Sequence, residues 1–257
     1  MKTVLVTGAC INTGVAIVEK FASEGYNVIF TGRSMEKVHA AEKAYKEKFP
    51  SVDIIGYHID SLLNERTVDE ESVEKMFTDI DARGLFVDTL VLNAADQGLE
   101  QNIFENPLTD FMRVVNTNVV WNFCLCKNAS ERMIKNGGGN IVFVNSNTAY
   151  RAIPDRVAYI ASKGGQLGLM RALALDLGKY NIRVNAVLPG MIKTDRWEKN
   201  PEFYAKVPSR FTPIGDVAVG EDIADAVYYF AAHARNTTGA ELVVDGGNNI
   251  QLYPIIK

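Results

Sequence analysis

Several short segments of the chain are nearly continuous in apolar or β-branched residues, a pattern typical of strands buried on both faces. Longer segments with apolar residues at helical spacing separate them. In residues 14–25, for example, Val15, Val18 and Phe21 share one helical face, and Gly25 follows as a helix stop. The predicted strands are residues 3–7, 27–31, 52–59, 88–93, 140–145, 182–188 and 240–245.

This alternation of strands and helices predicts a doubly wound α/β fold, in which helices cover both faces of a parallel sheet. No Pro- or Ser-rich linker, low-complexity tract or internal repeat interrupts it, so we expect residues 1–257 to form a single domain. Ligands of such sheets bind beyond the carboxyl ends of the strands, and functional residues are expected there.

The amino-acid composition and the cysteine positions indicate which kinds of binding partner to expect. The chain is 47% hydrophobic and 23% charged, with a net charge of −4, which gives no sign of a nucleic-acid or anionic-membrane partner. Cys10, Cys124 and Cys126 lack the spacing of a disulfide framework or a metal site, and we expect no metal. Without a signal peptide or a membrane-length apolar run, the protein is expected to be cytoplasmic.

The stretch TGACINTG, residues 7–14, lies between a predicted strand and a predicted helix. Glycines in such a turn let the backbone approach a pyrophosphate, and the helix that follows offers free N–H groups. Gly8 and Gly14 are present, and Asn12 at the middle position tolerates a left-handed backbone. The stretch predicts a phosphate-binding turn, with an ordinary strand–helix connection as the alternative.

Tyr159 and Lys163, in YIASK, fall on one face of a predicted helix. A nearby ammonium would lower the tyrosine pKa from its usual value of about 10 and allow proton transfer to a substrate oxygen. Ser146 follows a predicted strand and could share that oxygen. A solvated helix face and a polar turn are the alternatives for these residues.

Together these segments resemble the short-chain dehydrogenase/reductase family over essentially the whole chain. The motifs that carry the resemblance are TGACINTG, LNAADQ (92–97), VVNTN (114–118), Ser146 with YIASK, LPGMIKT (188–194) and VVDGG (243–247). The resemblance implies a Rossmann-type sheet of about seven strands and hydride transfer between a nicotinamide cofactor and a small-molecule carbonyl or secondary alcohol. It also implies a homotetramer or a homodimer.

The resemblance also implies roles for individual residues. Tyr159 would be general acid in reduction and general base in oxidation, and Lys163 would lower its pKa and bind the nicotinamide ribose. Ser146 would hydrogen-bond the substrate oxygen, and Asn116 would help to hold a water in a proton relay. The implied cofactor-binding residues are Thr7, Gly8, Asn12, Thr13, Gly14, Asp60, Asn93, Ala94, Tyr159, Lys163, Pro189, Gly190, Ile192 and Thr194.

Residues at the end of the second predicted strand favour NADP(H) over NAD(H). An acidic side chain there would bind the ribose 2′-hydroxyl of NAD, but Thr31 and Gly32 occupy these positions. Arg33 and Ser34 follow and could hold a 2′-phosphate. Against this, Ile11 stands where NADP-preferring relatives often carry a second basic residue.

The remaining segments give expectations about the substrate and about subunits. Residues 194–213 resemble a substrate lid whose aromatic side chains either line an apolar pocket or pack the lid onto the body. Tyr150 and Arg151 are further candidates to face the substrate. Residues 61–66 look like an insertion, and the apolar tail 248–257 is expected to dock on its own body or on another subunit.

The leading hypothesis is an NADP(H)-dependent carbonyl reductase or secondary-alcohol dehydrogenase. One alternative is a 3-oxoacyl-carrier-protein reductase, although no basic surface for an acidic carrier protein is evident. Another is a nucleotide-sensing regulatory protein with the same fold, which the intact Tyr159 and Lys163 disfavour.

Overall fold

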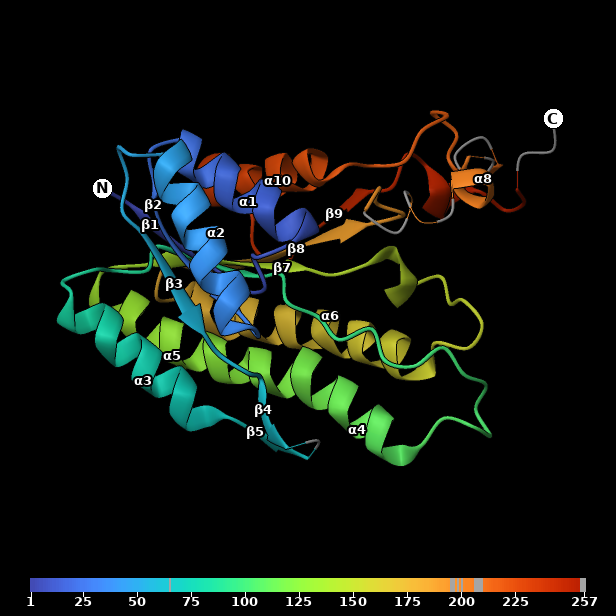
Figure 1. Ribbon diagram of the computed structural model, residues 1–257, viewed down its shortest axis with the longest axis horizontal. Helices are drawn as coiled ribbons and strands as arrows, with labels where there is room; N and C mark the ends of the chain where they lie inside the picture. Colours follow the sequence, from blue (N-terminus) through green and yellow to red (C-terminus); the bar gives the residue numbers. More distant parts are fainter. Residues whose placement is uncertain (65, 195–196, 198, 200, 206–209, 255–257) are drawn as a thin grey trace.

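A computed structural model describes residues 1–257 except 65, 195–196, 198, 200, 206–209 and 255–257. Its centre is a seven-stranded parallel sheet of order β3-β2-β1-β6-β7-β8-β9 (Figure 1). The strands are β1 Thr3–Val6, β2 Asn27–Gly32, β3 Ile54–His58, β6 Thr89–Leu92, β7 Gly139–Val144, β8 Ile182–Pro189 and β9 Glu241–Val244. Each coincides with one of the predicted strands, so the predicted fold class is confirmed.

Helices cover both faces of this sheet (Figure 1). One face carries α1 Asn12–Ser23, α2 Met35–Lys48 and α10 Gly220–Tyr228, and the other carries α3 Glu70–Ala82, α4 Leu108–Val115, α5 Trp121–Lys135 and α6 Val157–Gly178. Shorter elements are α8 Pro201–Tyr204, the 3₁₀ turns Asn147–Ala149 and Asn248–Ile250, and the π-helical turns Asn116–Val120 and Tyr229–His233. No described helix is long and apolar enough to cross a bilayer.

Apolar side chains form a core on each face of the sheet. Phe21 of α1 packs with Val28 and Phe30 of β2 on one face, and Phe77 of α3 packs with Phe143 of β7 on the other. All of these side chains are fully buried, because the strands of a parallel sheet have no solvent face.

The strand order reverses between β1 and β6, where successive connections leave the sheet in opposite directions. The connections after β1 and after β6 therefore diverge at the carboxyl ends of the strands, and a crevice opens between them. This is the place at which the sequence predicts the site.

The segment expected to be an insertion, 61–66, leads into a small hairpin of β4 Leu62–Asn64 and β5 Thr67–Val68. The hairpin packs against the π-helical turn Asn116–Val120, and the hydroxyls of Ser61 and Thr117 lie 3.1 Å apart. The hairpin is thus anchored beside the crevice.

The described part of the C-terminal tail docks on its own body through polar contacts. Arg151 donates to the carbonyls of Asn248 and Asn249, at 2.8 Å each, and Gln251 donates to the carbonyl of Phe211. The side chains of Leu252 and Tyr253 remain exposed, which leaves an apolar surface at this end of the chain.

Gly14 is required where α1 meets the turn after β1, because a Cβ there would lie 2.4 Å from the Gly8 carbonyl oxygen and 2.7 Å from the Ala9 Cα. We expect Gly14→Ala to lower the free energy of unfolding by more than about 2 kcal/mol in urea denaturation. Gly178→Ala is the control, since a Cβ there meets open space and favours the helix by up to about 1 kcal/mol. Equal stabilities for the two variants would contradict this packing.

Candidate active site

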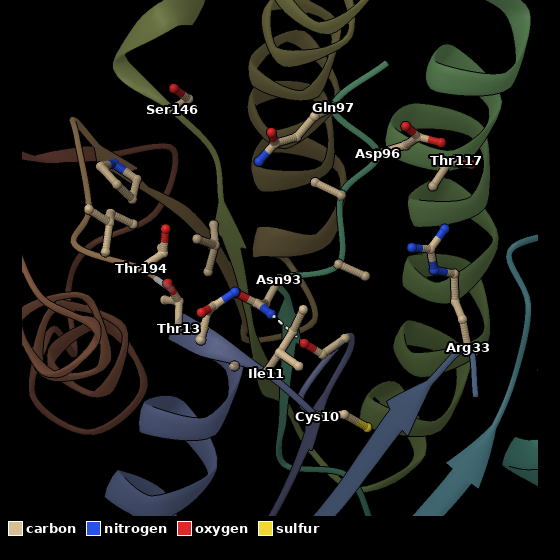
Figure 2. A pocket seen from close by; sticks show the side chains of 18 of the residues that line it. Cys10, Ile11, Thr13, Arg33, Asn93, Asp96, Gln97, Thr117, Ser146 and Thr194 are labelled. Carbon is tan, nitrogen blue, oxygen red and sulfur yellow. Dashed lines mark hydrogen bonds between the residues drawn. The ribbon is translucent and has the colours of Figure 1, made fainter. Parts of the chain in front are cut away.

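A cavity of about 1020 Å³ lies at the carboxyl ends of β1, β2, β6, β7 and β8 (Figure 2). Its volume is in the upper part of the range of small-molecule sites. Most predicted site residues meet in its wall: Gly8, Asn12, Thr13, Gly14, Arg33, Ser34, Asn93, Ala94, Ser146, Tyr159, Lys163, Pro189, Gly190, Ile192 and Thr194. Thr7, Asp60 and Asn116 do not line it.

The turn after β1 has the backbone that the sequence predicts. Gly8 and Asn12 both lie in the left-handed region, with φ of 66° and 49°. Asn12 therefore adopts the left-handed backbone that a glycine readily adopts at such a position.

Thr7 and Asn93 brace this turn. The Thr7 hydroxyl accepts hydrogen bonds from the N–H groups of Asn93 and Ala94, at 3.0 Å each. The Asn93 amide in turn donates to the carbonyls of Thr7 and Gly8, also at 3.0 Å each. Both side chains thus act on the shape of the turn, and Thr7 does so from outside the cavity wall.

The N-terminus of α1 points into this turn and suits an anion. Ile11 is its N-cap residue, makes no side-chain capping bond, and no acidic side chain lies in the first turn. The first N–H groups of the helix and its dipole are therefore available to a phosphate group.

Two cations and a hydroxyl gather at the end of β2. Arg33, Ser34 and Lys37 all line the cavity, and Lys37 lies close enough to Cys10 for its charge to oppose the rise that burial causes in the pKa of that thiol. Ser34 caps α2 by accepting a hydrogen bond from the Lys37 N–H, at 3.3 Å. Lys37 lies outside the motifs that predict the site, although a lysine in the first turn of a helix is unfavourable to the helix dipole and is therefore a signal of a possible role.

Asp60 is exposed, while its neighbours Ile59 and Ser61 line the cavity. The contact of the Asp60 side chain with the adenine half therefore stays a prediction, since Asp60 lies beside the cavity and outside its wall.

Ser146, Tyr159 and Lys163 come together at the end of β7. The Lys163 Nζ lies 5.6 Å from the centre of the Tyr159 ring and donates to the carbonyl of Val144, at 3.0 Å. Ser146 accepts hydrogen bonds from the N–H and the hydroxyl of Thr148. The predicted trio thus shares one wall of the cavity.

Burial governs the protonation of this trio. Burial raises the pKa of Tyr159, against the hydrogen bond with Ser146 and the charge of Arg156, which lower it. Burial also lowers the pKa of Lys163 to about 7. The net direction for Tyr159 is thus set by burial, while Lys163 binds a backbone carbonyl and is itself desolvated.

The structure does not bring Asn116 to the trio. Its amide donates to the carbonyl of Arg66 in the hairpin, at 3.2 Å. Asn118, two residues later, is fully buried and donates to the Ser162 hydroxyl, at 2.9 Å. The π-helical turn rotates successive side chains differently from an α-helix, so their directions could not be inferred from helical spacing.

Aromatic side chains close the substrate end of the cavity. Trp197 and Tyr204 line it and stack with ring centres 4.6 Å apart, while the Trp197 indole N–H donates to the carbonyl of Ile192, at 3.1 Å. These residues both pack the predicted lid onto the body and line the pocket. The lid positions 195–196, 198, 200 and 206–209 and the side chain of Phe203 lie outside the described residues.

Tyr150 and Arg151 point away from this cavity. The Tyr150 hydroxyl donates to Glu241 of β9, at 2.6 Å, and Arg151 holds the C-terminal turn. Asp96 and Gln97 line the cavity instead, and Gln97 lies between Asp96 and Ser146 in Figure 2. Both residues belong to the LNAADQ motif (92–97), which predicts no role for either side chain.

The sequence and the fold of this chain are similar to those of known oxidoreductases. A family model described as enoyl-(acyl carrier protein) reductase matches residues 8–249. A 3α-hydroxysteroid dehydrogenase of Mediterraneibacter gnavus is 34% identical over 248 residues, covering 95% of this chain and 96% of that protein. A 3-oxoacyl-(acyl-carrier-protein) reductase of Aquifex aeolicus is 32% identical over 249 residues, covering 96% of each chain.

A solved structure of NAD⁺-bound xylitol dehydrogenase has a TM-score of 0.83 and 31% identity, covering 96% of this chain and 98% of that one. These proteins act on hydroxyl or carbonyl groups, and both the family model and the relatives extend over nearly the whole chain. The chain therefore belongs to the short-chain dehydrogenase/reductase family of oxidoreductases, which bind a nicotinamide cofactor.

Proposed function

We propose that the protein is an NADP(H)-dependent oxidoreductase that interconverts a small-molecule carbonyl and a secondary alcohol, with residues 1–257 as one catalytic domain. The observation that carries the proposal is the meeting of Ser146, Tyr159 and Lys163 in the wall of one cavity, beside a turn suited to a pyrophosphate. The cofactor, when bound, supplies or accepts the hydride.

In this proposal Tyr159 transfers the proton. Its raised pKa keeps the phenol protonated at neutral pH, as a general acid in carbonyl reduction requires. In alcohol oxidation the phenolate must form, and a positive charge on Lys163 would favour it. Ser146, within hydrogen-bonding reach of Tyr159, would share the substrate oxygen and stabilise the negative charge that develops on it.

We assign the relay role to Asn118 instead of Asn116. Asn118 is buried beside Ser162, which precedes Lys163, whereas Asn116 binds the hairpin on the outer side of the π-helical turn. A proton that passes from Lys163 toward solvent would travel beside Asn118.

The cavity wall also supports a preference for NADP(H). The N-terminus of α1, with Gly8, Asn12 and Thr13, would hold the pyrophosphate, while Arg33 and Lys37 would share the 2′-phosphate. Two cations and no carboxylate line the end of β2, which suits a dianion. Lys37 compensates for the missing basic residue at Ile11.

At the substrate end, we propose that Gln97 binds a polar group of the substrate and that residues 194–213 act as the lid. Gln97 is exposed to the cavity, and its side chain makes no hydrogen bond within the described part of the chain. The stacked Trp197 and Tyr204 would cover the apolar part of the same molecule.

A 3-oxoacyl-carrier-protein reductase is the second candidate, favoured by the name of the Aquifex aeolicus relative. We also propose a cytoplasmic location. A homo-oligomer is proposed because the exposed Leu252 and Tyr253 leave an apolar surface near the end of the described chain. Assays with a 3-oxoacyl thioester and with simple ketones would separate the two activities.

Tyr159→Phe is expected to lower kcat by about 10²- to 10⁴-fold, because the proton donor is lost, while the Kd for NADPH stays within about twofold. Tyr150→Phe is the matched control, since that phenol lies outside the cavity. Steady-state kinetics and a fluorescence titration measure both quantities. A Tyr159→Phe enzyme with near-normal kcat would remove Tyr159 from the reaction.

Arg33→Ala and Lys37→Ala should each weaken NADPH binding by about 10-fold and leave NADH binding nearly unchanged, because each removes a charge-assisted contact with the 2′-phosphate. Lys43→Ala, an exposed lysine on the same helix, serves as the control. Nucleotide fluorescence titration gives the Kd values. Equal losses for NADPH and NADH would contradict the assignment.

Lys163→Met should stabilise the cofactor-free protein most at pH 7 and below, with a gain that shrinks as the pH approaches 10.5. Burial lowers the lysine pKa from 10.5 to about 7, so between these values the unfolded chain carries a proton that the folded protein lacks. The lysine therefore costs stability fully below pH 7 and not at all above 10.5. Urea denaturation of both proteins across this range measures the difference, and a constant difference would mean that Lys163 is charged when folded.

A further inference from the structure

A network of three buried amides and one buried hydroxyl lies behind the catalytic trio. Asn118, Asn145, Ser162 and Gln166 are each at most 4% exposed. They come from the π-helical turn, from the end of β7 and from α6. None of the four was assigned a role from the sequence, and the reaction proposed above uses only Asn118.

Gln166 is the member that joins the others. Its Nε2 donates to the main-chain carbonyl of Asn118, at 2.8 Å, and its Oε1 accepts from the Asn145 Nδ2, at 3.1 Å. One carboxamide therefore uses its donor and its acceptor on two different segments of the chain.

On the β7 side, the contact fixes the orientation of the Asn145 amide. The Asn145 Nδ2 also donates to the carbonyl of Lys163, at 3.0 Å, which leaves the Asn145 Oδ1 to accept from the N–H of Ser146, at 2.7 Å. If the Asn145 amide were flipped, its NH₂ group would face the Ser146 N–H, and two donors cannot form a hydrogen bond. Gln166 thus reaches the backbone of Ser146 through one intermediate side chain.

On the side of the π-helical turn, the contact fixes Asn118. Its Nδ2 donates to Ser162, whose hydroxyl donates to the carbonyl of Tyr159, at 2.7 Å. Its Oδ1 accepts from the N–H of Asp96, at 2.7 Å, in the connection that follows β6. The same carboxamide therefore links the segments that carry Tyr159, Ser146 and the substrate end of the cavity.

We propose that Gln166 is a positioning residue of the reaction, whose carboxamide holds Ser146 and Asn118 in register with Tyr159 and Lys163. The expected effect of Gln166 on turnover rests on the proposed function, whereas its expected effect on the positions of Ser146 and Asn118 does not. A buried network of this kind is rigid when every member is satisfied, and it loses its geometry when one member is removed.

The physical alternative is that Gln166 only fills space. Met170 offers the matched comparison, because it lies one turn further along α6, is fully buried, and has no hydrogen bond among the described residues. Gln166→Leu and Met170→Leu both conserve volume approximately, but only the first removes a hydrogen bond from the Asn118 carbonyl and one of the two that the Asn145 NH₂ group donates.

We expect Gln166→Leu to lower kcat by about 10-fold or more, while KM and the Kd for NADPH change by less than about threefold. Met170→Leu should leave all three within about twofold. The acidic limb of the pH profile for alcohol oxidation should move to higher pH in Gln166→Leu, because the hydrogen bond with Ser146 lowers the Tyr159 pKa and is loosened.

A measurement without turnover separates this inference from the proposed function. Ultraviolet difference titration of each protein against its Tyr159→Phe counterpart gives the titration of that phenol alone. An upward shift in Gln166→Leu supports the positioning role even if the wild-type protein reduces no carbonyl compound, in which case the proposed function alone fails. Unchanged kcat together with an unchanged Tyr159 titration would overturn the role of Gln166.

Gln166→Glu decides the question if the leucine variant does not fold. A protonated glutamic acid can donate to the Asn118 carbonyl and accept from Asn145, whereas the ionised form cannot donate. Its kcat relative to the wild type should therefore be close to one at low pH and fall as the pH rises through the carboxyl pKa. A ratio that does not change with pH would contradict the need for the donor on Asn118.

Discussion

Burial of the Lys163 amino group is the constraint on which the rest of the site depends. The side chain is 1% exposed, and its amino group donates to the carbonyl of Val144, the last residue of β7. Removing an ammonium from water is costly unless it is paired, so the fold must supply the surroundings that tolerate it. These surroundings are the apolar strands of the sheet, against which α6 packs the lysine that it carries. The same burial brings the lysine pKa close to neutrality and keeps Tyr159 protonated.

The parallel sheet turns this local arrangement into a site. Reversal of the strand order between β1 and β6 separates the connections that follow these strands, and the trio at the end of β7 faces the opening. On the far wall, the turn after β1 and the start of α1 present an anion-binding surface. Behind the trio, the Gln166 carboxamide joins the π-helical turn to β7. In the proposed function, acid–base chemistry and nucleotide binding share one cavity because the carboxyl edge of one sheet positions the residues for both.

Local patterns in the sequence were sufficient for the fold and for the residues of the main motifs. Buried parallel strands leave a strong apolar signal, and the motif residues lie at strand ends, where a parallel sheet gathers them. Asn12 was interpreted correctly because tolerance of a left-handed backbone is a property of the residue itself.

Properties that depend on tertiary surroundings could not be predicted in this way. Asn116 and Asn118 differ in direction because of a π-helical turn, and Tyr150 and Arg151 bind β9 and the tail from the far end of the sequence. The pKa of Tyr159 followed desolvation, which helical spacing to Lys163 does not reveal. Lys37 lines the cavity from α2, whereas the predicted cofactor preference rests on residues 31–34 at the end of β2.

The most direct test of the central claim is transfer of deuterium from NADPH labelled at C4 of the nicotinamide, in both stereochemical forms, to a panel of ketones, sugars and a 3-oxoacyl thioester. The account predicts that, with the wild-type protein, one of the two labelled forms places deuterium on the carbinol carbon of a product. With Tyr159→Phe the same transfer is expected to be much slower. Absence of deuterium from every product, with NADPH bound and the protein folded, would contradict an oxidoreductase that works through this site.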